Sequence, residues 1–455
     1  MTDDVGYRER MGALLRSTAN DLKRNSAAAA KDLGLSEAEY QDLVNGRREL
    51  SAPALAAVSR SWPVNERDIL PIHNDCPDGV LRFAAEDSAA SARVLSRGGA
   101  DYYEYRDTAM SRLASFRPEW IRMLAVVDDD KPDNPAVQWN NGHLLYQFTY
   151  FVGPVNYYYR WGGRSHVLRM RTGDSIWGLP FSPHTFTARR AGEPAYILAL
   201  TYGGELTGDA RHELSALGLA TARKFAMTGT DEAATVRGRL RSFLDAAMMS
   251  AGELARLTGW PVRRLAELVE GTATASAEEL AVLADALRVS VRDLLPIGID
   301  SPCDICVVRG ADARRWPYPA PERHDYTVTE LAGNRLHPHT RALEIRPRRE
   351  HGDVGAFLTT YQHQYLYNVG ADPLAMRWEH AGREHRTVLH PGDSAYVMPF
   401  VPCAYGVERT ADHPCLLALR INGSVTGEVR TALGAMHPGG LERMLHEDRA
   451  WYREE

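Results

Sequence analysis

The sequence predicts an α+β protein in which a small all-α unit followed by an antiparallel β-barrel occurs twice in tandem. A constant offset of 225 residues joins two stretches of the chain, an internal repeat that is typical of duplicated units. It relates Gly34, Leu43, Val44, Gly46, Ser51, Leu55 and Pro71 to Gly259, Leu268, Val269, Gly271, Ser276, Leu280 and Pro296. After each helical stretch the sequence becomes rich in aromatic and β-branched residues between Gly and Pro turns, which predicts strands. The chain has 455 residues, 44% hydrophobic and 25% charged, which is ordinary globular composition for about three domains.

The helical units are predicted from the signals at their helix ends. Gly34 closes an alanine-rich helix, and Ser36 with Glu39 three residues later forms a capping box for the next one. Gly46 ends that second helix, and Ser51 begins a third. Two helices joined by a three-residue turn fit a helix-turn-helix. Each unit therefore resembles the small helical domain of phage repressors.

The strand-rich regions repeat at an offset of about 217 to 219 residues, so that Gly173-Asp174-Ser175 corresponds to Gly392-Asp393-Ser394. This turn, followed by an aromatic strand and paired prolines, resembles the cupin, a small jelly-roll barrel. The predicted domains are helix-turn-helix 1 (1–72), cupin 1 (73–205), a helical linker (206–236), helix-turn-helix 2 (237–297), cupin 2 (298–430) and a C-terminal helix (431–455).

Composition excludes several classes of protein. No apolar run is long enough to span a membrane, and the N-terminus lacks the apolar region of a signal peptide. The net charge of −6 gives no reason to expect a nucleic-acid partner. The five cysteines are an odd number, which argues against a disulfide framework. Cys303 and Cys306 form one CxxC, whereas a structural zinc site needs further ligands, so reduced thiols in a cytoplasmic protein are expected.

A metal site is predicted in the first barrel only. If the segment around His143 is a strand, His143 and Gln147 lie on the same face, and His184 comes from a later strand. Two histidines and one oxygen donor are typical of non-haem Fe(II) sites. No carboxylate takes the usual third position, since Gln147 stands four residues after the first histidine and Gly178 six before the second.

The second barrel serves as an internal control. Thr360 and Cys403 replace the two histidines, and only the amide Gln364 is kept, so we expect no metal there. Asp174 is a further possible ligand, but it recurs as Asp393 in the same Gly-Asp-Ser setting. We interpret it as a turn residue.

The tandem layout and the run Asn140-Asn141-Gly142-His143, followed about forty residues later by Pro183-His184, resemble the family of 2-hydroxyethylphosphonate dioxygenase and methylphosphonate synthase. Hydroxypropylphosphonate epoxidase is a single-unit relative. The resemblance covers nearly the whole chain and implies the substrate ligands Lys23, Arg97, Tyr105 and Asn140, of which Lys23 and Tyr105 are also implied to be catalytic. The second half has Met248 and, on an approximate register, Thr329 in place of Lys23 and Tyr105.

The resemblance implies an Fe(II)-dependent dioxygenase that uses O2 to cleave 2-hydroxyethylphosphonate into hydroxymethylphosphonate and formate. It needs no 2-oxoglutarate, and its expected setting is phosphonate antibiotic biosynthesis. Methylphosphonate synthase, which gives methylphosphonate and CO2 from the same substrate, is the alternative, and Gln147 resembles its ligand pattern. In this family the lysine can come from a neighbouring subunit, so a homo-oligomer is expected and the origin of Lys23 stays open.

A helix-turn-helix transcription regulator with a cupin sensor is a more distant alternative. The acidic first recognition helix and the negative net charge disfavour it, because DNA binding needs basic contacts to phosphates.

Overall fold

The computed structural model describes residues 5–226, 232–295, 305–322, 324–348, 354–407 and 414–451. The chain divides into two compact units. The first comprises residues 1–202, 307–333 and 339–455, and the second comprises residues 203–306 and 334–338. No helix in these described ranges is long and apolar enough to cross a membrane.

The N-terminal helices of the first unit are α1 (Val5–Asp21), α2 (Ser26–Leu33), α3 (Glu37–Val44), α4 (Ala52–Ser61) and α5 (Glu66–Ile69). The predicted helix ends are confirmed: Gly34 has a left-handed φ of 69°, and Ser36 and Glu39 form a capping box. Leu15, Val58 and Trp62 are buried together in the core of this part.

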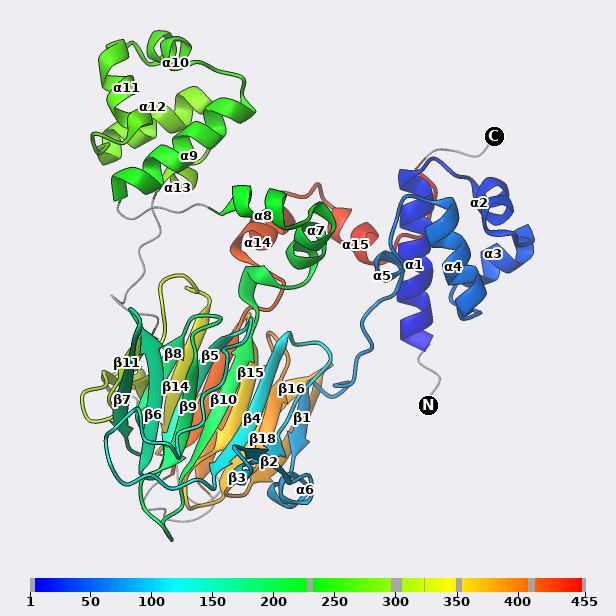
Figure 1. Ribbon diagram of the computed structural model, residues 1–455. Helices are drawn as coiled ribbons and strands as arrows, with labels where there is room; N and C mark the ends of the chain where they lie inside the picture. Colours follow the sequence, from blue (N-terminus) through cyan, green and yellow to red (C-terminus); the bar gives the residue numbers. More distant parts are fainter. Residues whose placement is uncertain are drawn as a thin grey trace. The chain divides into compact units, whose positions relative to one another are not determined.

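The β part of the first unit contains antiparallel sheets (Figure 1). The first-half strands are β1 (Val80–Phe83), β2 (Arg93–Arg97), β3 (Ala100–Asp107), β4 (Phe116–Met123), β5 (Tyr146–Val152), β6 (Val155–Trp161), β7 (Arg164–Met170), β8 (Ser175–Gly178), β9 (His184–Ala188) and β10 (Tyr196–Tyr202), with α6 (Ala85–Ala90) after β1. The second-half strands are β11 (Ile305–Val308), β12 (Arg315–Pro319), β13 (His324–Glu330), β14 (Thr340–Pro347), β15 (His363–Asn368), β16 (Leu374–His380), β17 (Arg383–Leu389), β18 (Ser394–Val397), β19 (Cys403–Val407) and β20 (Leu416–Ile421).

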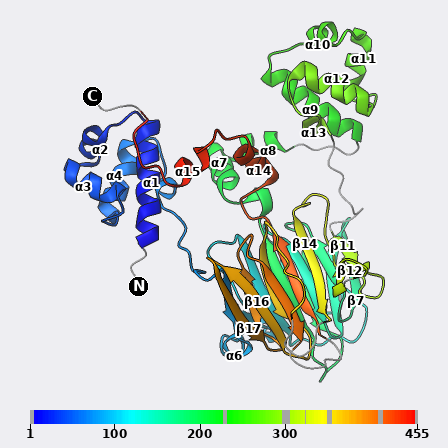
Figure 2. The ribbon, with the colours of Figure 1, turned by 180° about the vertical axis from the view of Figure 1, so that it is seen from behind.

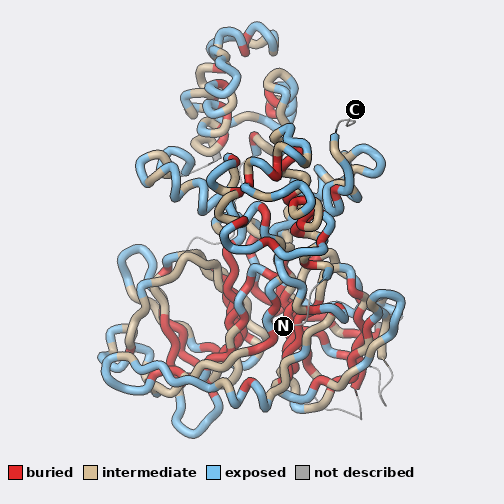
Figure 3. The backbone as a smooth tube through the Cα atoms, turned by 90° about the vertical axis from the view of Figure 1, so that its right-hand side faces the viewer, coloured by how far each residue is buried: buried red, intermediate tan, exposed pale blue. Residues whose placement is uncertain are grey.

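Each half forms one seven-stranded and one three-stranded sheet. The orders are β11-β8-β5-β10-β4-β3-β2 and β7-β6-β9 for the first half, and β1-β18-β15-β20-β14-β13-β12 and β17-β16-β19 for the second. The strands of the two halves lie side by side in the ribbon (Figure 2). Side chains join the two large sheets, since the Tyr150 hydroxyl donates to Glu344 at 2.6 Å and the Phe116 and Tyr396 rings lie 6.2 Å apart. Buried residues are concentrated along these strands (Figure 3).

The two halves exchange a strand, because β1 joins the second-half sheet beside β18 and β11 joins the first-half sheet beside β8. The Gly-Asp-Ser turns hold the incoming chains: Asp393 pairs with Arg82 at 2.6 Å, and Asp174 pairs with Arg309 at 2.8 Å. Asp174 also accepts from the backbone N–H of Arg171, as a turn residue does. The turn motif therefore recurs because each copy anchors a strand from the other half.

Backbone geometry shows the repeat directly. Lys23 and Met248 have left-handed φ values of 57° and 49°, and Phe181 and Phe400 have 60° and 61°. The predicted counterpart of Tyr105 is wrong by one residue. Tyr105 pairs with Ile121, and in the second half Val328 occupies the equivalent register, so Thr329 lies one position further along the strand.

The second unit contains η1 (Gly204–Leu206), α7 (Asp209–Leu217), α8 (Leu219–Phe225), α9 (Glu232–Ala246), α10 (Ala251–Thr258), α11 (Val262–Glu270), α12 (Ala277–Leu287) and α13 (Val291–Leu294). Leu240, Leu254, Leu265 and Leu283 form the core of helices α9 to α12. Cys303, one half of the predicted CxxC, lies outside the described residues.

The expected C-terminal helix is shorter than predicted. The chain forms α14 (Gly427–Gly434) and α15 (Gly440–Leu445), separated by a segment that contains Pro438, which cannot continue a helix. Beyond α15 the chain is held by side chains instead, because Glu447 accepts from Arg443 and from the Trp451 indole.

Candidate metal and substrate site

The two predicted ligand histidines line a cavity of about 340 Å³ on one face of the first-half sheet. Neighbouring strands contribute side chains in order across the sheet, from Gln147 on β5 through Thr201 on β10, Glu119 on β4 and Tyr105 on β3 to Arg97 on β2. The other lining residues are Tyr103, Ile121, Asn140, Gly142, His143, Leu145, His184 and Phe186.

His143 does not lie on a strand, contrary to our expectation, because β5 begins only at Tyr146. A tight loop positions it instead. Gly142 has a φ of +71°, and a Cβ there would lie 2.5 Å from the backbone of Phe181, so only glycine fits. The Phe181 N–H donates to the His143 carbonyl at 2.7 Å, which fixes the loop. This loop, and not the alternation of side chains along a strand, therefore brings the His143 ring to Gln147.

The contact between His143 and Gln147 has the geometry of a metal site. The Gln147 amide N–H donates to Thr149 at 2.8 Å, so its Oε1 faces His143 Nε2 at 3.0 Å. His143 Nδ1 lies 3.0 Å from the Leu145 carbonyl, and donation to it leaves Nε2 as an acceptor. In that tautomer the lone pairs of Nε2 and Oε1 face each other, an arrangement that a cation relieves, whereas in the other tautomer the Nε2–H donates to Oε1. Adjacent corners of an octahedron with bonds of ~2.1 Å are about 3.0 Å apart, so the residues fit a metal ion.

His184 completes the donor set from the start of β9. Its ring centroid lies 5.3 Å from that of His143, with the ring planes perpendicular. His184 Nδ1 lies 2.9 Å from the Ser182 carbonyl, which leaves Nε2 free for a ligand bond. Burial lowers the pKa of His184 to about 4, so the imidazole is neutral at physiological pH, as a metal ligand must be.

Depressed histidine pKa values predict acid sensitivity of the metal-free protein. Burial also lowers the pKa of His363 to about 4, whereas an unfolded histidine titrates near 6.5. Between these values the unfolded state binds more protons than the folded state, so stability falls as the pH decreases. Each histidine contributes up to about 1.4 kcal/mol per pH unit over that window. Urea unfolding at pH 6.5 and pH 5 checks this, and equal stabilities would contradict it.

The substrate residues implied by the resemblance divide into two groups. Arg97, Tyr105 and Asn140 line the cavity. The Asn140 side-chain oxygen accepts from the N–H groups of Gly142 and His184, which turns the amide nitrogen toward other partners. The Arg97 guanidinium lies 4.9 Å from the centre of the Tyr103 ring, which also lines the cavity.

Lys23 is not among the residues that line the cavity. It follows α1, its ammonium donates to the Asp21 carbonyl at 2.9 Å, and it lies 4.6 Å from the centre of the Trp451 ring. The structure of this single chain therefore does not bring Lys23 together with the other three residues.

In the second half, an arginine side chain occupies the equivalent place. Thr201 pairs with Gln147, and Arg420 stands at the same register beside Gln364. The Arg420 guanidinium donates to the Gln364 oxygen at 3.0 Å. The oxygen that corresponds to the Gln147 donor is therefore already bound by a cationic side chain.

Replacing Cys403 with alanine should leave the iron content of the protein unchanged. Cys403 corresponds to His184, is fully buried, and burial raises its thiol pKa to about 12, which keeps it from acting as a thiolate ligand. Metal analysis after anaerobic reconstitution checks this expectation. A loss of metal would place a second site in the other half.

Five lining residues were not predicted from the sequence: Tyr103, Glu119, Ile121, Phe186 and Thr201. Glu119 and Thr201 lie within β4 and β10 and belong to no motif. Alternation with buried neighbours was the only available signal, and it does not distinguish a cavity from ordinary packing. Among the described residues no third histidine, cysteine or carboxylate joins the two histidines as a ligand group, so Glu119 lies in the cavity but outside the donor set.

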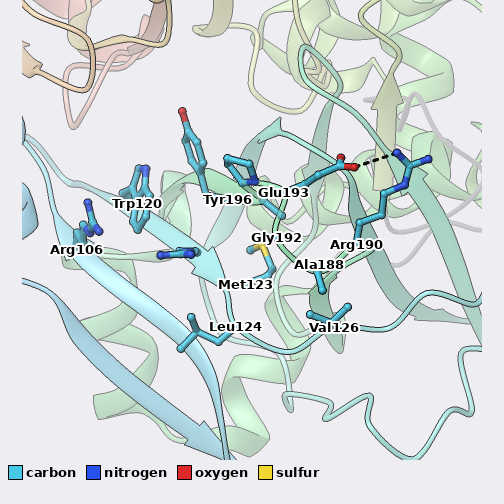
Figure 4. Close-up of a pocket in the computed structure, with 14 residues that line it drawn as sticks. Arg106, Trp120, Met123, Leu124, Val126, Ala188, Arg190, Gly192, Glu193 and Tyr196 are labelled. Atoms are coloured by element: carbon cyan, nitrogen blue, oxygen red, sulfur yellow. Dashed lines mark hydrogen bonds and ion pairs between the residues drawn. The ribbon is translucent and has the colours of Figure 1, made fainter.

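A larger cavity of about 460 Å³ lies on the other face of β4, since its lining residues Trp120 and Arg122 alternate with Glu119 and Ile121 (Figure 4). The Arg106 guanidinium lies 4.1 Å from the centre of the Trp120 ring. The lining residues include no histidine or cysteine, so the histidine-lined cavity is the candidate site.

Comparison with known proteins finds relatives that match nearly the whole chain. Methylphosphonate synthase from Nitrosopumilus maritimus (strain SCM1) is 37% identical over 448 residues, which cover 98% of this chain and 96% of the relative. A Streptomyces albus 2-hydroxyethylphosphonate dioxygenase, solved with its substrate 2-hydroxyethylphosphonate and Fe(II) bound, has 51% identity and a TM-score of 0.94, and the match covers 99% of this chain and 100% of that chain.

Two further matches concern the fold. Another 2-hydroxyethylphosphonate dioxygenase structure shares 20% identity with a TM-score of 0.74, covering 95% of this chain and 99% of that chain. Residues 239–297 match a Cro/C1-type helix-turn-helix DNA-binding domain, which fits the helices of the second unit.

Antiparallel sheets and helical segments make this a mixed α and β protein, and its cavity gathers two imidazoles and an amide oxygen that fit a metal ion. The chain belongs to the family of methylphosphonate synthase and 2-hydroxyethylphosphonate dioxygenase.

Proposed function

We propose that this chain is an Fe(II)-dependent dioxygenase that cleaves the carbon–carbon bond of 2-hydroxyethylphosphonate with O2 and releases hydroxymethylphosphonate and formate. One observation carries the proposal: the His143, Gln147 and His184 donors share a cavity with Arg97 and Tyr105. The Streptomyces albus relative with 2-hydroxyethylphosphonate and Fe(II) bound supports the choice of substrate and metal.

His143, Gln147 and His184 would hold the iron, which when bound would supply the oxygen activation. Carbonyl groups that accept from each Nδ1 keep the two imidazoles in the ligand tautomer. A neutral amide in place of a carboxylate leaves the donor set uncharged, which favours an anionic substrate.

The cavity residues bind and orient the phosphonate. Arg97 offers a planar fork for two phosphonate oxygens, and Asn140 and Tyr105 offer neutral donors. Lys23 adds a point charge, which a neighbouring copy of the chain supplies in our proposal, because Lys23 does not line the cavity of its own chain. We therefore propose a homo-oligomer, in which each cavity is completed by a partner.

Methylphosphonate synthase activity is the second candidate, with methylphosphonate and CO2 as products. Gln147 and the 37% identical relative favour it. Gly178 stands directly opposite Gln147 in the β5–β8 pair and offers no carboxylate. Beside Gln147, Leu145 lines the cavity, whereas Tyr146 stacks on Trp177.

The finer architecture is part of the proposal. We assign the helical parts to two helix-turn-helix domains and the β part to two cupins. The boundaries are those predicted above, except that β1 and β11 are exchanged between the cupins and the C-terminal segment forms two short helices. The Cro/C1-type match at 239–297 supports the second helical domain. A cytoplasmic location and the absence of a nucleic-acid partner complete the assignment.

Phosphorus NMR of the iron-loaded protein distinguishes the candidates. The protein is loaded anaerobically, given 2-hydroxyethylphosphonate and then exposed to air. A hydroxymethylphosphonate signal together with formate supports the dioxygenase, whereas a methylphosphonate signal makes the chain a synthase with the same site. If neither product forms, the substrate assignment is wrong, and DNA binding at low and high salt becomes the next test.

A further inference from the structure

We propose that Glu119 is a specificity residue that accepts a hydrogen bond from the hydroxyl group of the substrate and so fixes the hydroxyl-bearing end in the cavity. The inference rests on the proposed function, since it assigns a role within the same phosphonate site. Neither the metal ligands nor the phosphonate-binding residues include Glu119.

The register of the sheet places Glu119 among the site residues. On β4, Glu119 pairs with Ala199 on β10. Two residues further along β10, Thr201 pairs with Gln147 on β5. On its other side Glu119 pairs with Asp107 on β3, the strand that carries Tyr105. Glu119 therefore lies between the strand of Gln147 and that of Tyr105.

The surroundings show that the carboxyl group is available to a ligand. No hydrogen-bond partner of its side chain is found among the described residues, although it is half-buried. Burial raises its pKa, and the charges of Arg93 and His143 oppose that rise while Asp107 adds to it. Glu119 and Tyr105 are diagonal neighbours in the β3–β4 pair and line the same cavity. Burial raises the pKa of Tyr105, and the Glu119 charge adds to that rise. Such a group in a cavity gains stability when a ligand supplies a donor.

The second half of the chain indicates that Glu119 belongs to the site. The residue at the equivalent register is Leu343, which pairs with Ala418 as Glu119 pairs with Ala199. Leu343 is buried in the apolar core of its half. The half that lacks the two histidines thus also lacks this carboxylate. A carboxyl group needed only for the fold would be expected in both copies.

The hydrogen-bond donors and acceptors of the substrate determine which part of it Glu119 contacts. A phosphonate is an anion with only acceptor oxygens when fully ionised, and a carboxylate beside it would repel it. Arg97 and Asn140 provide the donors that the phosphonate requires. The hydroxyl is the only strong donor on 2-hydroxyethylphosphonate, and a carboxyl oxygen is its natural acceptor.

The test compares binding of two ligands to the iron-loaded protein without oxygen, by calorimetry. Ethylphosphonate lacks only the hydroxyl of 2-hydroxyethylphosphonate. The Glu119→Leu variant, which introduces the second-half residue, should bind 2-hydroxyethylphosphonate at least about tenfold more weakly and ethylphosphonate no more weakly than the wild type does. Glu119→Gln keeps an acceptor oxygen and should lose less. Iron content should stay the same in both variants, because Glu119 lies outside the donor set.

Asp107→Asn is the matched control, since Asp107 faces Glu119 in register but pairs with Arg93 at 2.8 Å and does not line the cavity. It should leave the preference for the hydroxylated ligand unchanged. The inference is overturned if Glu119→Leu keeps the wild-type preference or weakens both ligands equally. If the iron-loaded wild type binds neither phosphonate, the proposed function fails and this inference with it, so the two failures are distinguishable.

Discussion

Replacing His184 with alanine should reduce iron affinity by more than about a hundredfold and abolish turnover, because a two-histidine site cannot lose one imidazole and keep its metal. The Ser182 carbonyl at its Nδ1 and the Asn140 side chain at its backbone N–H position His184 as a ligand. Replacing His143 should have the same effect. Metal analysis after anaerobic reconstitution and dialysis measures the loss, and circular dichroism checks that the fold is kept.

The matched control for these variants is His363→Ala. His363 lies at the start of β15, is partly buried, and contacts the Tyr396 hydroxyl at 2.6 Å. Its replacement should lower stability but leave iron binding intact. Full iron occupancy in His143→Ala or His184→Ala would show that the proposed donor set is wrong. Loss of iron in His363→Ala would show that iron loss in this assay reflects a destabilised fold and not the loss of a metal ligand.

The sequence allowed much of this site to be predicted because its ligands are carried by short motifs. The Asn140-to-His143 run and the Pro183-His184 pair were identified from spacing, and the repeat supplied a comparison with Thr360 and Cys403. The structure brings those residues into one cavity. The predicted strand geometry of His143 was wrong, since its ring reaches Gln147 through the left-handed turn at Gly142 and not by strand alternation.

Other features depend on pairing between distant strands, which one sequence does not reveal. The exchange of β1 and β11 between the halves follows from long-range pairing, and so does the one-residue shift from Thr329 to Val328 opposite Ile345. Glu119 is recognised as a cavity residue only from the strand order, which places β4 between β10 and β3. A single half-buried glutamate within a strand has no spacing signal of its own.

Replacing Asp393 with alanine should destabilise the protein by about 3 kcal/mol, because it removes the group that anchors the exchanged strand β1. The Asp393 side chain is 2% exposed and accepts from Arg82 at 2.6 Å and from the backbone N–H groups of Ala85 and His390 at 2.8 and 2.9 Å. Arg82 can turn to water, but the two N–H groups lose their acceptor. Urea unfolding of the metal-free protein measures the change.

Comparison of Asp393→Ala with Asp174→Ala separates effects on the stability of the protein from effects on the geometry of the metal site. Both remove a strand anchor, so both should destabilise, whereas Glu384→Ala, which breaks the exposed pair with Arg377, should change stability by less than about 0.5 kcal/mol. Asp174 precedes β8, whose Gly178 pairs with the ligand Gln147, so its loss should also weaken iron binding. Asp393 anchors the half without the histidines, and its replacement should leave iron affinity unchanged. Equal effects of both variants on iron binding would mean that the halves are coupled through the exchanged strands, and an unchanged stability in both would mean that the Gly-Asp-Ser motif acts only as a turn.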